Sequence, residues 1–286
     1  MRILVTGGTG TVGSQVAREL AARGAQVSVL TRNPQNAKSL PSGVNAVEGD
    51  LLSAKTVQQV FDGIDGVFLL NALGRTEAHE GLQAVCGMRL AGVKRIVYQS
   101  VQDVDRVPYL PHFGSKLAIE HAVRGSGIPF TILRPSHFFQ NDYMTKDAIL
   151  GGFYPQPIGN VGTSRVDVRD IADAAATSLL SADHEGQTYE LVGPEVLTGD
   201  SVAQTWSLAL GREVKYVGDD LDGWQRQSLH FLPDWLVFDL RLMFEHFQRH
   251  GLKGSNEAVA RLTGMLGHPP RSFEAFAKET AAQWQA

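Results

Sequence analysis

The sequence predicts an α/β protein built on a doubly wound parallel sheet, and two observations carry this prediction. Between residue 3 and about residue 133, short continuous apolar runs alternate with longer segments of helical periodicity. Buried parallel strands have this appearance because helices cover both faces of their sheet. In addition, Gly24, Gly92 and Gly127 each separate a helical segment from the next apolar run, at the point where a helix end favours positive φ.

The elements can be assigned in chain order. The six apolar runs, expected to be strands, span residues 3–5, 27–30, 44–47, 67–70, 96–98 and 130–133. The helical spacing of Val16, Leu20 and Ala21 indicates a first helix. Further helices are expected at residues 54–61, 78–91 and 112–126. Strands that alternate with helices in this way form a parallel sheet.

Beyond Pro135 the alternation breaks down. A stretch rich in glycine and proline covers residues 151–162, followed by an apolar segment at 166–168, a helix at 171–180 and a strand at 188–192. Further helices are expected at residues 201–210, 235–247, 255–262 and 273–284. We therefore expect a first domain over residues 1–134 and a smaller, mostly helical lobe over residues 135–286, with about residues 163–193 returning to the first domain. Ligands of open α/β sheets bind at the carboxyl ends of the strands, so the lobe is expected to supply a lid or substrate pocket.

Composition and charge exclude several classes of protein. The chain of 286 residues is 43% hydrophobic and has a formal net charge of −4, without the basic block that nucleic-acid-binding proteins use. Its one cysteine, Cys86, cannot form an internal disulfide, which is typical of a reducing compartment, and its apolar helical surroundings predict a packed thiol. Neither a signal peptide nor a membrane-spanning segment is recognisable. We expect a soluble, cytoplasmic protein with no nucleic-acid or membrane partner.

A glycine-rich loop follows the first strand and opens the first helix. Gly7, Gly10 and Gly13 recur at intervals of three, in the order strand, loop, helix that a dinucleotide site requires. Such glycines allow a tight turn and close approach of the backbone to a pyrophosphate, and the amides at a helix N-terminus favour phosphate charge. The alternative is a surface turn with no ligand. The expected cofactor-binding residues of this loop are Thr6, Gly7, Thr9, Gly10, Thr11, Val12 and Gly13.

Residues at the ends of the next strands extend this cofactor site. Arg32 stands where sites that prefer NAD carry an acid for the ribose hydroxyls. Because a guanidinium matches a phosphate with a bidentate fork, Arg32 indicates the 2′-phosphate of NADP(H); the alternative is an exposed arginine that contacts nothing. Asp50 and Leu51 are candidates for the adenine edge and ring, although Asp50 equally fits a cap or turn. Asn71 either lies beside the cofactor or satisfies its own turn.

These motifs, with others along the chain, resemble the NmrA-like group of atypical short-chain dehydrogenase/reductases. The resemblance is carried by residues 5–13, 31–34, 48–51, 112–116, 133–135, 166–172 and 269–274. The group includes NADPH-dependent quinone reductases, triphenylmethane-dye reductases and NADPH-sensing regulators. The resemblance covers nearly the whole chain. It implies a Rossmann-type sheet that binds NADP(H) through residues 1–134, with a C-terminal substrate lobe.

One motif departs from the pattern of the superfamily. Typical members carry Tyr-x-x-x-Lys, in which the lysine binds the nicotinamide ribose and the tyrosine donates a proton. This chain has His112 and Lys116 at that spacing, and Tyr109 is out of register. The resemblance implies a ribose contact for Lys116, on the same helical face as His112. His112 either protonates the reduced substrate or only starts its helix, partly exposed, while solvent supplies the proton.

Further site residues follow the fifth and sixth strands. The resemblance assigns Ser100 to the pocket, although a strand-end hydroxyl can also bond its own backbone. The chain from Pro135 through His137 and Phe138 is expected to pass the nicotinamide. Phe138 or Phe139 is a candidate wall for a flat substrate, although aromatic residues in such a run more often belong to a core.

Two functions remain open from the sequence. The first is an NADPH-dependent reductase, monomeric or homodimeric, that transfers hydride to a flat, electron-poor aromatic or conjugated substrate: a quinone, a dye, or a conjugated imine or enone. The second is a non-enzymatic NADP(H) sensor that acts through a protein partner. No metal site is predicted, because the pair His246 and His250 has Phe247 where a zinc protease carries its glutamate.

Overall fold

The computed structural model of the protein describes residues 1–33, 35 and 40–285. Pro34, part of the motif after the second expected strand, lies outside the described residues. The chain divides into two compact units. The first comprises residues 1–135 and 168–190, and the second comprises residues 136–167 and 191–286. Within the described part of the chain, no helix has both the length and the apolar character needed to cross a membrane.

The first unit is built on a parallel sheet. Over the described residues the sheet has seven strands, in the order β3-β2-β1-β4-β5-β6-β8. Adjacent strands from β3 to β6 pair in parallel. The strand order reverses between β1 and β4, which is where ligands of doubly wound sheets bind. The strands are β1 (Arg2–Val5), β2 (Gln26–Thr31), β3 (Asn45–Glu48), β4 (Gly66–Leu69), β5 (Arg95–Gln99), β6 (Phe130–Pro135) and β8 (Thr188–Leu191).

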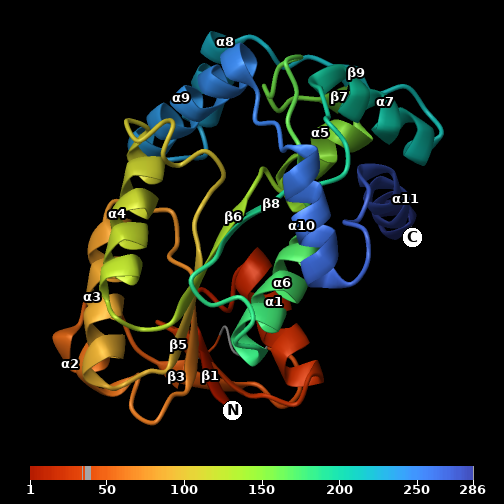
Figure 1. The fold of residues 1–286 in the computed structure, drawn as a ribbon. Helices are drawn as coiled ribbons and strands as arrows, with labels where there is room; N and C mark the ends of the chain where they lie inside the picture. The colour runs from red at the N-terminus through yellow and green to blue at the C-terminus, as the bar shows by residue number, and fades with distance from the viewer. Residues whose placement is uncertain (34, 36–39, 286) are drawn as a thin grey trace. The chain divides into compact units, whose positions relative to one another are not determined.

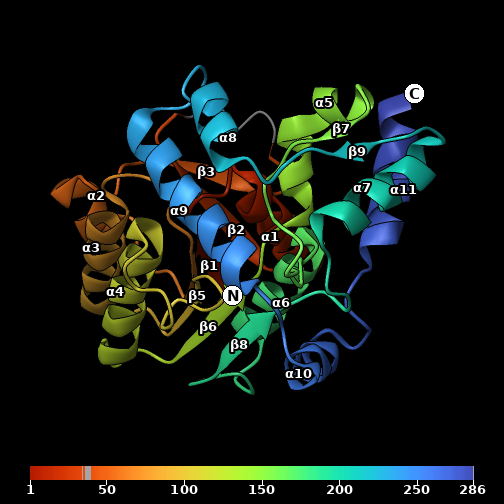
Figure 2. The same cartoon turned by 90° about the horizontal axis from the view of Figure 1, so that it is seen from above.

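Helices cover both faces of this sheet, as Figure 1 and the view from above in Figure 2 show. One face carries α1 (Thr11–Ala22) and α6 (Val168–Leu180), which pack on each other. The other carries α2 (Ala54–Gln59), α3 (Glu77–Leu90) and α4 (Pro111–Gly125), with α3 packed between its two neighbours. Covered faces explain why the strands are continuous apolar runs.

The core of the first unit lies between the sheet and these helices. Leu4, Val67, Ile96 and Ile132 enter it from four different strands, and Met88 enters it from α3. All five side chains are 0% exposed. The strands are therefore held by burial on the face that α2, α3 and α4 cover, and their carboxyl ends are fixed relative to one another.

The second unit is mostly helical. Its elements are η2 (Phe139–Thr145), a 3₁₀ helix, followed by α5 (Lys146–Leu150), β7 (Phe153–Tyr154), α7 (Gly199–Leu210), β9 (Lys215–Tyr216), α8 (Leu221–Ser228), α9 (Asp234–His250), α10 (Asn256–Leu266) and α11 (Phe273–Gln285). The strands β7 and β9 pair in parallel. Helix α7 packs on α11, where Trp206 stacks on Trp284 with 4.9 Å between ring centroids.

The predicted α/β fold class is confirmed, and the structure differs from the expectations in several details. The short elements η2, α5, β7 and β9 were not predicted. Helix α8 was not predicted, because its sequence is polar and Ser228 is its only buried residue among those described. Cys86, expected to be packed, is exposed. The buried side of α3 is formed instead by small and apolar residues such as Gly81, Ala84 and Met88.

Candidate functional site

The loop between β1 and α1 is a narrow turn closed by its own backbone. Gly7 has φ +63°, and the Gly10 amide donates to the Gly7 carbonyl at 3.0 Å. A Cβ on Gly13 would lie 2.3 Å from that carbonyl oxygen, so a larger residue does not fit. Thr6 ties the turn to the end of β4: its Oγ1 accepts from the Leu70 amide at 2.8 Å and donates to the Leu70 carbonyl at 2.9 Å.

The N-terminus of α1 has the properties of an anion site. Gly10 is its N-cap, none of the described side chains caps it, and its first turn has no acidic residue. Thr9, Gly10 and Thr11 are exposed, whereas Val12 and Gly13 are buried. First-turn amides have no acceptor within their own helix and bind phosphate groups readily. Residues 7–13, the glycine cradle, therefore fit a pyrophosphate at the uncapped N-terminus of α1.

Arg32 lies just beyond β2 with an exposed side chain. The turn that follows is fixed by Thr31, whose Oγ1 accepts from the Asn33 amide at 3.2 Å. Asn33 Oδ1 in turn accepts from the Gln35 amide at 2.9 Å. This turn holds the chain at the carboxyl end of β2, where an exposed guanidinium is accessible to an anion. Its contact with a 2′-phosphate stays a prediction.

Asp50 and Leu51 follow β3 and differ in their surroundings. Asp50 is half-buried, and its Oδ1 accepts from the Leu52 amide at 2.9 Å, which is the hydrogen bond of an Asx turn. Leu51 is buried in the hydrophobic core of the first unit. The geometry of Asp50 thus matches its turn interpretation, and the expected adenine contacts of both residues stay predictions.

Buried polar atoms gather at the ends of β4 and β5, which are neighbours in the sheet. Both amide atoms of Asn71, Ser100 Oγ and Gln99 Oε1 are buried and have no hydrogen-bond partner among the described residues. The local bonds that were the alternatives for the Asn71 and Ser100 side chains are therefore not formed. Because buried polar groups are nearly always hydrogen-bonded, these atoms indicate a ligand or water that completes this edge of the sheet. Gln99 was not predicted from the sequence.

The His112 and Lys116 side chains project from α4, one turn apart. His112 is the second residue of α4, as the helix-start alternative expected, but it is buried, at 8% exposed, so the expected partial exposure is wrong. Its ring contacts Phe113 at 4.7 Å between centroids. Lys116 Nζ lies 2.7 Å from Glu77 Oε1 of α3, with side-chain exposures of 13% and 0%. No sequence motif pointed to Glu77.

Tyr98 lies beside this ion pair but does not replace the missing tyrosine. Burial, and next the charges of Glu77 and Glu120, raise the pKa of Tyr98 well above its usual value. Its hydroxyl donates to the backbone carbonyl of Lys116 at 3.5 Å. Tyr109 is 69% exposed. Neither tyrosine takes the place of a proton donor one turn before Lys116.

Pro135 ends β6, and His137 and Phe138 open the second unit. The half-buried His137 ring meets Phe244 and Phe247 of α9 edge to face, with 6.5 and 5.9 Å between ring centroids. Burial, and next the charge of Arg165, lower the pKa of His137 well below its usual value. The Nδ1 atom of His137 is buried and has no hydrogen-bond partner within the described chain.

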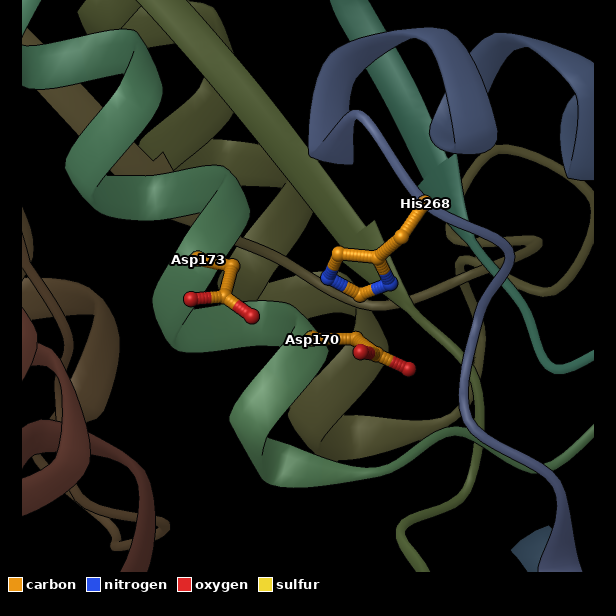
Figure 3. A group of neighbouring side chains, drawn as sticks. All are labelled: Asp170, Asp173 and His268. Carbon is orange, nitrogen blue, oxygen red and sulfur yellow. The ribbon is translucent and has the colours of Figure 1, made fainter.

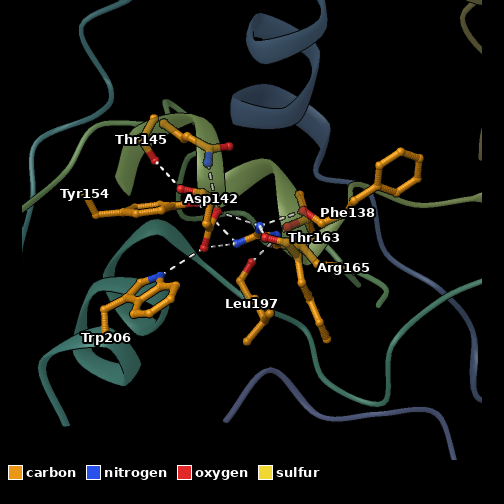
Figure 4. Close-up of polar contacts among 10 residues, drawn as sticks. Phe138, Asp142, Thr145, Tyr154, Thr163, Arg165, Leu197 and Trp206 are labelled. Carbon is orange, nitrogen blue, oxygen red and sulfur yellow. Dashed lines mark hydrogen bonds and ion pairs between the residues drawn. The ribbon is translucent and has the colours of Figure 1, made fainter. Parts of the chain in front are cut away.

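A buried ion pair fixes the backbone at Phe138 (Figure 4). Arg165 Nη2 donates to the Phe138 carbonyl at 2.7 Å and lies 2.7 Å from Asp142 Oδ1. Phe138 itself is half-buried and stays a candidate wall for a substrate. Phe139 does not, because it is fully buried and packs against Phe273 with 5.1 Å between ring centroids.

Figure 3 draws two acidic residues of α6, Asp170 and Asp173, together with His268 of the second unit. Asp170 is buried, and Asp173 Oδ1 lies 3.4 Å from Arg23 Nη2 of α1. His268 Nδ1 lies 2.7 Å from the carbonyl of its neighbour Pro269. Asp173 is thus paired with arginine, and the expectation that the chain has no metal site stays a prediction.

A model of the NmrA-like family matches residues 1–277 of the chain. The chain belongs to the NmrA-like family. The resemblance drawn from the sequence motifs is thereby confirmed. The match extends over both units, so the glycine loop, α4 and the segment after β6 all belong to one family pattern.

Relatives match this NmrA-like chain over nearly its full length. An NAD(P)H azoreductase of Xenophilus azovorans is 33% identical over 290 residues, which cover 99% of each protein. A (4-alkanoyl-5-oxo-2,5-dihydrofuran-3-yl)methyl phosphate reductase of Streptomyces griseus is 31% identical over 282 residues, 98% of each. The solved structure of an NADPH-dependent quinone oxidoreductase from Escherichia coli, complexed with NADPH, is 24% identical with a TM-score of 0.86 and covers 99% of this chain and 100% of that one. This last likeness shows the fold.

Proposed function

We propose that this NmrA-like chain is an NADPH-dependent reductase that transfers hydride to a flat, electron-poor organic substrate such as a quinone, a dye, or a conjugated imine or enone. The observation that carries the proposal is the glycine cradle: the N-terminus of α1 is exposed at residues 9–11, no described side chain caps it, and Gly13 packs so closely on the loop that no larger residue fits. Two relatives that match 98% or more of the chain are named as an NAD(P)H azoreductase and as a reductase of a butenolide phosphate, which supports the same reaction class.

The residues divide between the two halves of the cofactor. In this proposal Thr6, Gly7 and residues 9–13 hold the pyrophosphate, and Arg32, Asp50 and Leu51 hold the adenosine half. At the other half, Asn71, Ser100 and Lys116 of the first unit bind the nicotinamide riboside, and Pro135, His137 and Phe138 keep their expected contact with the nicotinamide. The unpartnered buried atoms of Asn71 and Ser100 support this placement, because a bound ligand supplies the hydrogen bonds that they lack. NADP(H), when bound, supplies the hydride from nicotinamide C4.

The substrate class follows from the missing proton donor. A simple ketone needs an acid at the moment that hydride arrives, because its alkoxide is strongly basic. This chain has His112 where such a tyrosine would stand. A quinone or a conjugated dye spreads the new negative charge over its own π system, so its proton can arrive afterwards from His112 or from water. Placement of the two reactants is then the main task of the protein.

Steady-state NADPH oxidation with a panel of quinones, azo and triphenylmethane dyes, conjugated imines and saturated ketones tests the proposal. We expect turnover of at least one conjugated acceptor and none of the saturated ketones. Calorimetric titration with NADPH and NADH accompanies the panel. Tight binding of NADPH without turnover of any acceptor would indicate the sensor function instead. Absence of binding to either nucleotide would refute the cofactor site itself.

A further inference from the structure

The lysine of α4 is held by a carboxylate from the neighbouring helix. Lys116 Nζ donates to Glu77 Oε1 at 2.7 Å, and the Glu77 side chain is 0% exposed. Glu77 is the first residue of α3. A carboxylate in the first turn of a helix is favoured by the helix dipole, which offsets part of the cost of burying it. The ammonium of Lys116 offsets a further part of this cost.

Close packing of α3 on α4 makes this contact possible. Gly81 lies one turn after Glu77 on the same face of α3, and a Cβ there would come within 2.4 Å of the Ile119 side chain. Ile119 in turn follows Lys116 by three residues on α4. Glycine at position 81 therefore allows the two helices to approach closely, so that a glutamate side chain spans the distance to the lysine.

The position of Glu77 in the chain connects it to the cofactor site. The segment from Asn71 to Thr76 joins β4 to α3, and Asn71 carries two of the unpartnered buried atoms. Glu77 thus begins the helix that follows β4 in the chain, and its carboxylate binds Lys116. A long lysine side chain has several rotamers of similar energy, and one charged hydrogen bond to a rigid acceptor selects among them.

We propose that Glu77 is a positioning residue that orients the Lys116 ammonium toward the nicotinamide ribose of NADP(H). This inference rests on the ribose contact assigned to Lys116 under the proposed function. Glu77 does not touch the cofactor. It acts through Lys116, and it neutralises a charge that in a Tyr-x-x-x-Lys site would act on the tyrosine.

The test compares two ligands that differ in the half of the molecule that Lys116 serves. NADPH has a nicotinamide ribose, whereas adenosine 2′,5′-bisphosphate has only the adenosine half. Calorimetry with both ligands is carried out on the wild-type protein and on Glu77→Gln, Glu77→Asp and Lys116→Met. Glu120→Gln is the matched control, because the Glu120 side chain is 1% exposed and pairs with Arg134 at 2.8 Å. Thermal unfolding of every variant reports the structural cost.

We expect Glu77→Gln to weaken NADPH binding roughly tenfold, the scale of one misplaced charge-assisted hydrogen bond, and to leave adenosine 2′,5′-bisphosphate unaffected. Glu77→Asp keeps the charge, and we expect a smaller loss of NADPH affinity with adenosine 2′,5′-bisphosphate binding again unaffected. This variant replaces Glu77→Gln in the test if Glu77→Gln does not fold. Glu120→Gln lowers the unfolding temperature without that selectivity.

Each of the following results would overturn the inference. Equal weakening of both ligands by Glu77→Gln, or the same pattern in Glu120→Gln, would mean that the carboxylate only stabilises the fold. Unchanged NADPH binding in Glu77→Gln, while Lys116→Met weakens it, would mean that Lys116 needs no orientation. If Lys116→Met itself leaves NADPH binding unchanged, the ribose contact fails and the role of Glu77 fails with it. That last outcome differs from the others because it removes part of the proposed function.

Discussion

The Asp142 carboxylate and the Arg165 guanidinium form an ion pair in which neither side chain is exposed to solvent. The same carboxylate accepts hydrogen bonds from Trp206 Nε1 at 2.9 Å and from Gln156 Nε2 at 2.8 Å. Burying two charges is costly unless their remaining hydrogen-bonding capacity is satisfied. Here the donors surround the carboxylate, and Arg165 also holds the Phe138 carbonyl. The pair therefore determines the backbone of the segment that we expect to pass the nicotinamide.

Asp142→Asn is expected to lower the free energy of unfolding by about 3–5 kcal/mol, because it leaves the Arg165 charge buried without its counterion. Urea unfolding followed by circular dichroism measures the loss. Glu245→Gln is the control: it breaks the exposed pair with Arg249, whose atoms are 2.6 Å apart, and should cost less than about 1 kcal/mol. A loss for Asp142→Asn no greater than that of the control would show that the buried pair does not stabilise the second unit.

Gly13→Ala is expected to abolish NADPH binding, because the new Cβ would lie 2.3 Å from the Gly7 carbonyl oxygen and 2.7 Å from Gly8 Cα. The loop must then open, and the cradle is lost. Gly264→Ala is the matched substitution: Gly264 lies within α10, and no atom comes within 4 Å of the place that its new methyl group would take. Alanine there should stabilise the protein by about 0.5–1 kcal/mol and leave binding unchanged. Normal NADPH affinity in Gly13→Ala would contradict the cradle.

Asp65 gives an expectation for acid stability. The Arg2 amide, and next Lys94, lower the pKa of Asp65 from 3.8 to about 2. A carboxyl whose folded pKa is depressed stabilises the fold above its unfolded pKa and loses that contribution as the pH falls through the folded value. Asp65→Asn should therefore lower the unfolding midpoint at pH values above about 4, with the difference from wild type shrinking toward about pH 2. Urea titrations across this range check it, and a difference independent of pH would contradict it.

The sequence predicts those parts of the molecule whose signals are local. The strands of the first unit show as apolar runs, and the glycine loop shows as a spacing of three between Gly7, Gly10 and Gly13. The periodicity of a strand or helix depends on its immediate neighbours and on burial, so it is readable without knowledge of the fold. Helix α8 could not be predicted in this way, because only Ser228 of its residues is buried.

The ion pairs could not be predicted, because they join residues far apart in the chain. Lys116 and Glu77 are 39 residues apart, and Arg165 and Asp142 are 23 apart. Each pairing depends on how one element packs against another, which a local pattern does not record. For the same reason, the sequence could not decide whether Phe138 or Phe139 is the candidate wall for a substrate. Adjacent aromatic residues look alike in sequence, and only packing against Phe273 places Phe139 in the core.

Arg32→Asp is expected to exchange the nucleotide preference of the protein. Arg32 is exposed at the carboxyl end of β2, where a guanidinium attracts a 2′-phosphate and an aspartate repels it but accepts hydrogen bonds from ribose hydroxyls. NADPH binding should weaken by roughly 10- to 100-fold, the loss of one charge-assisted contact together with new repulsion, while NADH binding stays within about threefold. Isothermal titration with both nucleotides measures the two affinities, and Arg89→Asp, an exposed position on α3, controls for the change in net charge. Equal losses for NADPH and NADH would show that Arg32 does not bind the 2′-phosphate. The alternative interpretation, a solvent-exposed arginine that contacts nothing, would then hold.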